Sequence, residues 1–272
     1  MKITADSFKR SVFKMFNKIA ITSIGDYIDY INYFINIWHP FIWFRGVSNS
    51  SFKLIPSIYR DDVWNYHPNN AEDIKNLFIL RARGYLQNRY NLKKWEWYQI
   101  MQHHNLPTRL LDWTTGSLIA LYFACRHSDG KAMPSVWLLN PERLNLLSQK
   151  KNVVFVTDEL TTDLHDSNVD YYLSDKGNKL PKYPIGIQPP YVNDRMRTQK
   201  SCFTVHGKDK IGLENLYKEN KDFQLVQLQI SANITSEIKK DLVKAGISES
   251  TLFPDLDGLA RELCFEYETW LS

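Results

Sequence analysis

Apolar residues recur with two different periods along this chain, and the two periods predict a mixture of helices and strands. A spacing of three and four residues predicts two amphipathic helices before Pro40, which form an N-terminal helical segment over residues 1–39. Later helices are predicted at residues 70–85, 95–104, 117–125, 236–246 and 254–270. Alternation or a short apolar run predicts strands at residues 41–45, 109–113, 134–140, 153–156, 183–190, 195–207 and 223–230.

Two of the predicted helices differ in how their apolar residues are distributed. The run at residues 117–125, SLIALYFAC, is apolar on all sides, which predicts an interior helix. The last helix instead concentrates its apolar residues on one face, formed by Leu256, Leu259, Ala260, Leu263 and Tyr267. With no linker between the strands and the helices, we expect an α+β fold: one domain over residues 40–272, with the N-terminal segment packed on its core.

Composition narrows the class of protein. The 272 residues carry a net charge of only +4, which permits a nucleotide or nucleic-acid partner but lacks the concentrated basic stripe of a dedicated DNA binder. The 8 Trp and 15 Tyr residues are enough to build a core and also to line a groove where planar groups stack. Three isolated cysteines, no apolar run of about 18 residues and no signal peptide indicate a cytoplasmic protein without a membrane partner.

The sequence WFRG places Arg45 and Gly46 at the end of an apolar strand. An unpaired charge buried there would cost several kcal/mol, so Arg45 needs an anion or a carbonyl as its partner. A structural ion pair with a carboxylate such as Asp112 and an anchor for phosphate or ribose in a cleft explain this arginine equally well, because its rigid fork of donors suits both.

A dense group of polar residues lies in the stretch QHHNLPTRLLDWTTGSLIALYFAC, residues 102–125. Its polar members include a histidine, an arginine, an aspartate and two threonines: His104, Arg109, Asp112, Thr114 and Thr115. Asp112 in an apolar strand must be paired, and Arg45 or Arg109 is its expected partner. The helix that follows Gly116 begins with unpaired N–H groups, which favour either an anion or a capping hydroxyl from Thr115 or Ser117. For any single hydroxyl, the capping interpretation is favoured.

Two further stretches carry charged residues that have ordinary structural explanations as well. In DRMRTQKSCFTVHG, Arg195, Arg197 and Gln199 would share one face of a strand, which is either a solvated face or part of a site. In TLFPDLDGLAREL, Asp255 and Asp257 are better explained as the start of a capped helix than as metal ligands, because no further ligands accompany them. We therefore expect no metal site.

Taken together, WFRG, LIPSIYR, QHHNLPTRLLDWT with ALYFA, QKSCFTVHG and TLFPDLDGLA resemble an FRG-domain protein. That family is named after its Phe/Trp-Arg-Gly signature and is associated with prokaryotes and their viruses. The resemblance extends over roughly residues 40 to 260.

The order of these motifs is also distantly similar to that of ADP-ribosyltransferases of the arginine-serine-glutamate type. This similarity implies an ADP-ribosyltransferase-like mixed β core flanked by helices, with NAD as a substrate. WFRG corresponds to the first element, DWTTGSLIALYFA to the second, and Gln199 lies where the third would be. The implied NAD-binding residues are Arg45, Gly46, His104, Arg109, Thr114 and Thr115.

The similarity departs from the family at the catalytic position, where Gln199 stands in place of a glutamate. Asp112 and Glu266 are the substitutes we consider, together with Glu262 and Glu268 near the end of the chain. The resemblance thus implies a mono-ADP-ribosyltransferase that modifies a protein or nucleic acid, as a toxin or phage-defence effector. The alternative is a non-catalytic module that binds a nucleotide or nucleic acid.

Overall fold

A computed structural model describes residues 19–38, 41–60, 70–86, 92–128, 130–158, 167–173, 179–220 and 222–271. The first of the two predicted N-terminal helices lies almost entirely outside these residues. The described chain divides into two compact units. Unit 1 comprises residues up to Phe52, Thr114–Asn140 and the residues from Gln224 onward, and unit 2 comprises Lys53–Trp113 and Pro141–Phe223.

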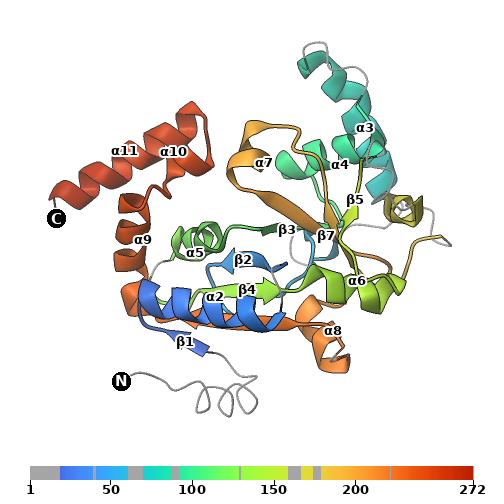
Figure 1. The fold of residues 1–272 in the computed structure, drawn as a ribbon. Coiled ribbons are helices and arrows are strands. Elements are labelled where there is room, and N and C mark those ends of the chain that lie inside the picture. The colour runs from blue at the N-terminus through green and yellow to red at the C-terminus, as the bar shows by residue number, and fades with distance from the viewer. Residues whose placement is uncertain are drawn as a thin grey trace. The chain divides into compact units, whose positions relative to one another are not determined.

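Unit 1 consists of a small sheet covered by helices (Figure 1). Its strands are β1 (Ile19–Ile21), β2 (Trp43–Val47), β4 (Ser135–Leu139) and β8 (Leu225–Ile230). Its helices are α2 (Ile24–Trp38), α5 (Ser117–Cys125), η4 (Ala232–Ile234), α9 (Thr235–Lys244), α10 (Glu249–Leu252) and α11 (Leu256–Leu271). The strand order is β1-β8-β4-β2, with β1 parallel to β8 and the other neighbours antiparallel.

The core of unit 1 forms where α2, α5 and α9 pack over one face of this sheet. α5 is buried almost all round, which confirms the interior helix predicted from its apolar sequence. The core side chains from the sheet include Phe44, Val136 and Leu228, and those from the helices include Tyr27 and Ile238. Burial of these large side chains contributes about 1.5–3 kcal/mol each, which holds the helices on this face.

Unit 2 contains a second group of strands: β3 (Leu110–Thr114, of which Thr114 belongs to unit 1), β5 (Phe155–Val156), β6 (Ile185–Gln188) and β7 (Ser201–Val205). Its helices are η1 (Ser57–Tyr59), α3 (Asn70–Ala82), η2 (Arg83–Tyr85), α4 (Lys94–His103), α6 (Pro141–Gln149), η3 (Ser167–Leu173), α7 (Asp194–Thr198) and α8 (Leu213–Glu219). The strand order is β3-β7-β6-β5, and β6 runs antiparallel to β7 but parallel to β5.

The core of unit 2 brings α4, η3 and α7 against its strands. Trp95, Tyr98 and Met101 project from α4 into this cluster, where they meet Phe203 of β7 and Tyr172 of η3. The inner face of α4 is therefore held in place by packing along its length.

Helix α6 is fixed to the strands by hydrogen bonds. The buried Asn145 side chain donates to the Gly186 carbonyl oxygen of β6 and accepts from the Gly186 N–H.

The mixture of helices with parallel and antiparallel strand pairs confirms the predicted α+β class. Three local predictions differ from the structure. Residues 19–21 form the edge strand β1 instead of ending a helix, because they pair with β8. Residues 194–198 form α7, whose first turn is capped by the Asn193 side chain accepting from the Met196 N–H at 2.9 Å. The strand expected at residues 153–156 is only two residues long.

Candidate ligand-binding site

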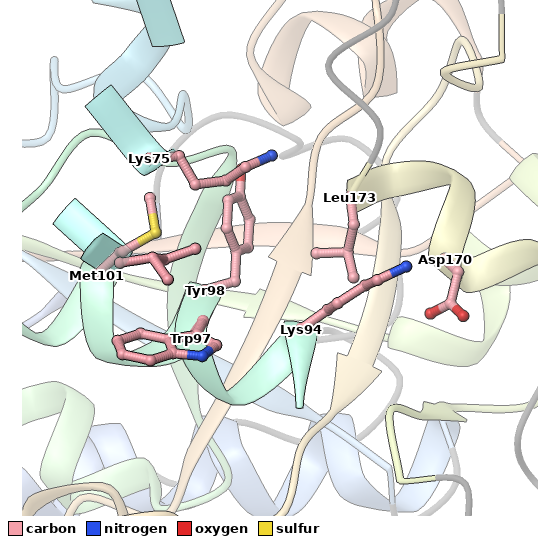
Figure 2. Close-up of a pocket in the computed structure, with 8 residues that line it drawn as sticks. Lys75, Lys94, Trp97, Tyr98, Met101, Asp170 and Leu173 are labelled. Carbon is pink, nitrogen blue, oxygen red and sulfur yellow. The ribbon is translucent and has the colours of Figure 1, made fainter. Parts of the chain in front are cut away.

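The clearest candidate for a binding site is a pocket of about 370 Å³ within unit 2. Its lining residues come from α3, α4 and η3: Lys75, Ile79, Lys94, Trp97, Tyr98, Met101, Asp170 and Leu173. Figure 2 shows Trp97, Tyr98 and Met101 projecting from α4, with the Lys94 side chain directed toward Asp170 and Leu173. A volume in this range suits a small ligand, since such pockets typically measure about 300–1,000 Å³.

The start of α4 determines where the lysine and the aromatic rings lie. Glu96 folds back so that its carboxylate accepts from the Lys93 backbone N–H at 2.7 Å, which satisfies one donor before the first turn. Lys93 also pairs through its ammonium group with Asp158 at 3.0 Å. Lys94 is then the first helical residue, where the helix dipole disfavours a cation. A bound anion would relieve this unfavourable placement.

Hydrogen bonds orient the other side chains around the pocket. The Asp170 carboxylate accepts from the indole N–H of Trp95 at 2.8 Å, so this carboxylate is already engaged by the core. The Tyr98 hydroxyl accepts from the Arg109 backbone N–H at 2.9 Å, which holds its ring against the pocket. The buried Arg109 guanidinium donates to the Tyr172 backbone oxygen. Arg109, predicted as an NAD-binding residue, thus helps to build the wall behind the pocket.

This arrangement suits a ligand that has both a planar ring and a negative charge. Trp97 and Tyr98 offer aromatic surface to the pocket. Aromatic side chains stack on planar groups, and nucleic-acid-binding proteins use such stacking to hold bases. The ammonium groups of Lys75 and Lys94 provide donors for phosphate. Against these two cations the lining holds a single carboxylate, that of Asp170, so the site favours an anion.

A second, more apolar pocket of about 520 Å³ lies between α3 and α4 in the same unit. His104, another predicted NAD-binding residue, lines it together with Ile74, Leu77, Phe78, Arg81, Ala82, Tyr85, Leu86, Ile100 and Leu106. The His104 ring meets the His103 ring edge to face at 4.9 Å between centroids. His104 is thereby placed beside aliphatic side chains and is not among the residues that line the first pocket.

The two candidate catalytic residues in unit 2 lie in different settings. Asp112 projects from β3 to an exposed position, where the Gln102 amide donates to its carboxylate at 2.9 Å. Strand alternation turns this side chain outward to water, while its neighbours Leu111 and Trp113 are buried. Gln199 directly follows α7 as its C-cap residue, so it does not share a strand face with Arg195 and Arg197 as expected.

In unit 1, Arg45 and Gly46 occupy opposite faces of β2. Arg45 lies directly across from Trp137 of β4, on the face away from α5. The indole N–H of Trp137 is buried and has no hydrogen-bond partner among the described residues. Gly46 faces α5 so closely that a Cβ atom on it would lie 1.9 Å from the Ala120 backbone oxygen. Helix packing therefore accounts for the glycine of the WFRG sequence.

The register of β2 also separates Arg45 from Thr114, two of the residues for which the resemblance implies NAD binding. Thr114 pairs with Phe44, so its side chain points to the face opposite that of Arg45. Its hydroxyl accepts from the Gly116 N–H at 2.9 Å, and Gly116 is the residue that precedes α5. The predicted cap by Thr115 or Ser117 is wrong, because the helix begins after Gly116 without a side-chain cap.

Thr115 is exposed and Glu266, the third candidate catalytic residue, lies half-buried on α11 of unit 1. The predicted residues therefore belong to both units: Arg45, Gly46, Thr114, Thr115 and Glu266 to unit 1, and His104, Arg109, Asp112 and Gln199 to unit 2. Lys75, Lys94, Trp97 and Tyr98 were not predicted as site residues from the sequence. The run KKWEWY at residues 93–98, two lysines followed by three aromatic residues, is the signal that could have identified them.

Across the described residues, no group of three histidine, cysteine, aspartate or glutamate side chains is arranged to hold a metal ion. None of the helices described is both long enough and apolar enough to cross a membrane.

Comparison with known proteins identifies one family model. No curated protein and no solved structure matches this chain. The family match covers residues 41–132. This segment contains β2, α3, α4, β3 and α5, and with them six of the eight residues that line the first pocket. The matching model is that of the FRG domain.

Proposed function

We propose that this protein binds a nucleotide in the pocket between α3, α4 and η3. The observation that carries the proposal is the juxtaposition of Lys75 and Lys94 with Trp97 and Tyr98 in one pocket of suitable volume. A phosphate would contact the ammonium groups, and the base would lie against the aromatic rings. This corresponds to the binding-module interpretation of the sequence, with NAD among the candidate nucleotides.

Isothermal titration calorimetry with NAD, ADP-ribose, ATP and a short single-stranded RNA tests this proposal. We expect one of these ligands to bind and Lys94→Glu to weaken its affinity by roughly 10-fold or more, because a hydrogen bond to a charged group contributes about 1.5–3 kcal/mol. Lys53→Glu is the matched control, since Lys53 is an exposed lysine of unit 2 outside the pocket lining. Equal weakening by both variants, or no binding of any of the four ligands, would overturn the proposal.

A second candidate function is ADP-ribosyl transfer from NAD to a protein or nucleic acid. The observation in its favour is the exposed Asp112 carboxylate, which the Gln102 amide holds in place from the neighbouring helix. In this reaction the bond between ribose and nicotinamide breaks, and nicotinamide leaves with the bonding electrons. An acceptor nucleophile then bonds to the ribose carbon and loses its proton. A fixed carboxylate would stabilise the positive charge that develops on the ribose.

Nicotinamide release from NAD distinguishes transfer from binding alone. If Asp112 is catalytic, Asp112→Asn should lower release by about 10²–10³-fold while leaving NAD affinity measurable. Gln199→Glu should raise release if Gln199 occupies the position of the family glutamate. Binding of NAD without release under any mixture of protein and nucleic-acid acceptors would leave nucleotide binding as the function. A role as a toxin or in phage defence rests on the same proposal and would require the transferase activity.

A further inference from the structure

Helix α11 of unit 1 presents an apolar stripe to solvent. The stripe consists of Leu256, Leu259, Leu263 and Tyr267, which are 83%, 45%, 54% and 67% exposed, together with the exposed Ala260. These positions follow a spacing of three and four residues, so they form a continuous line along one side of the helix. An exposed apolar line of this length is typical of a surface that another segment covers.

The opposite side of α11 is held against unit 1 by several specific contacts. Arg261 donates to the buried Glu249 at 2.9 Å, and Glu262 accepts from the Ser248 hydroxyl and the Ser250 N–H. Near the start of the helix, Gly258 approaches the Phe253 backbone so closely that no Cβ atom would fit. Because these contacts fix the rotation of the helix about its axis, the apolar stripe faces away from the core of its own unit.

Acidic residues flank the stripe on both sides. With a rotation of 100° per residue, Asp257 and Glu268 lie along one edge of the stripe and Glu266 lies along the other. The one basic residue of α11, Arg261, is turned inward to Glu249. Apolar residues between two acidic edges complement an amphipathic segment that has apolar residues between basic edges.

The N-terminal sequence of the chain has this complementary pattern. Residues 1–18 contain five basic residues and one acidic residue: Lys2, Lys9, Arg10, Lys14, Lys18 and Asp6. Their apolar residues recur at helical spacing: Phe8, Val12, Met15 and Phe16. These residues lie outside the described part of the chain. Their sequence alone predicts a basic amphipathic helix, the chemical counterpart of the α11 stripe.

We infer that residues 1–18 bind the apolar stripe of α11, with their basic residues beside Asp257, Glu266 and Glu268. The segment is joined directly to β1, which belongs to the same unit as α11. Eighteen residues can span up to about 60 Å when extended, against a radius of gyration of about 13 Å for a 100-residue domain. A tether of this length raises the effective concentration of the segment and favours binding without a large interface.

Cys264 offers a direct probe of this contact. It is exposed on α11 next to Leu263, whereas Cys125 and Cys202 are buried. Burial raises the pKa of Cys125 to about 12 and raises the pKa of Cys202 well above its usual value, which makes both thiols unreactive. Alkylation of the folded protein by a maleimide therefore reports on Cys264.

The experiment compares the maleimide rate of the full chain with that of three variants. Removal of residues 1–18 should accelerate alkylation of Cys264 by roughly 10-fold, the factor expected if the bound form is favoured by about 1.4 kcal/mol. Reversal of charge in the intact chain, as Lys9→Glu with Arg10→Glu and Lys14→Glu, should accelerate it similarly and keeps the test valid if the shortened chain fails to fold. Leu259→Glu, at the exposed stripe, should do the same.

Adding a synthetic peptide of residues 1–18 to the shortened chain should restore protection, and 0.5 M salt should weaken it. An alkylation rate that does not depend on protein concentration indicates that residues 1–18 bind α11 of their own molecule. A rate that depends on concentration indicates that they bind α11 of another copy, and in both cases residues 1–18 cover the stripe. Equal rates in the full and shortened chains would overturn the proposal. Protection that rises with protein concentration and survives removal of residues 1–18 would overturn it too, because two α11 helices would then cover each other.

Discussion

Gly46 of β2 approaches Ala120 of α5 so closely that a Cβ atom would lie 1.9 Å from the Ala120 carbonyl oxygen. The backbone nitrogen of Ala124, one turn further along α5, would lie 2.5 Å from the same Cβ. The backbone of a helix cannot yield locally to such a contact without losing its hydrogen bonds. The glycine after Arg45 is therefore required for the packing of α5 on the sheet, whatever Arg45 itself binds.

Gly46→Ala should destabilise the protein by about 1–3 kcal/mol, because the added methyl group forces α5 away from β2. Urea unfolding followed by circular dichroism measures this change. Gly84→Ala is the control, since nothing lies within 4 Å of a Cβ at that exposed position. A Gly46→Ala variant as stable as the control would show that α5 can move at no cost.

Glu249→Gln should destabilise unit 1 by about 3 kcal/mol. The Glu249 carboxylate is buried and accepts from both Arg126 and Arg261, and the Arg126 guanidinium also lies 4.2 Å from the Phe253 ring centroid. Loss of the negative charge leaves the Arg126 guanidinium without its anion in a mostly buried site. An uncompensated buried charge strongly destabilises the folded state. Thermal unfolding compares this variant with Asp241→Asn, which removes an exposed pair with Lys244 and should change stability by less than about 1 kcal/mol.

The same carboxylate predicts a dependence of stability on pH. Burial of Glu249 opposes its ionisation, but the hydrogen bonds from Arg126 and Arg261 outweigh burial and lower its pKa below the ordinary 4.5. A carboxyl group whose pKa is lower in the folded state stabilises the protein at pH values above its pKa in the unfolded state. That stabilisation is lost as the pH falls through its pKa in the folded state. The difference in unfolding free energy between wild type and Glu249→Gln should therefore be constant above about pH 5.5 and shrink below pH 4.5. A difference that stays constant down to pH 3 would contradict this account.

Asn145→Leu should destabilise unit 2 by at least about 2 kcal/mol. The buried Asn145 amide donates to Val153 and Gly186 carbonyl oxygens at 2.7 and 2.9 Å and accepts from the Gly186 N–H at 2.6 Å. Leucine has a similar shape but leaves these three backbone groups without their partner, and each buried unsatisfied group costs about 1–3 kcal/mol. Chemical denaturation should show no comparable loss for Asn152→Leu, an exposed position in the following loop.

Local sequence patterns determined most of the secondary structure of this protein. The helical spacing after Asn70, the all-apolar run of α5 and the alternation in β8 each predicted the element that forms, because each pattern reflects which sides of that element are buried. Short polar segments were predicted less well. Asn193 caps α7 through its own side chain, and this local bond prevails over the alternating pattern that suggested a strand.

Tertiary structure decided which side chains share a surface. The sequence predicted Arg45 and Thr114 at the ends of two apolar strands. The pairing of Thr114 with Phe44 directs the two side chains to opposite faces, and a register of this kind depends on contacts distant in sequence. The same holds for the pocket, where Asp170 and Leu173 join Lys75 and Trp97 only after the chain has folded. For α11, the sequence determined an apolar face, but only the contacts of Arg261 and Glu262 with residues 248–250 decided that this face points to solvent.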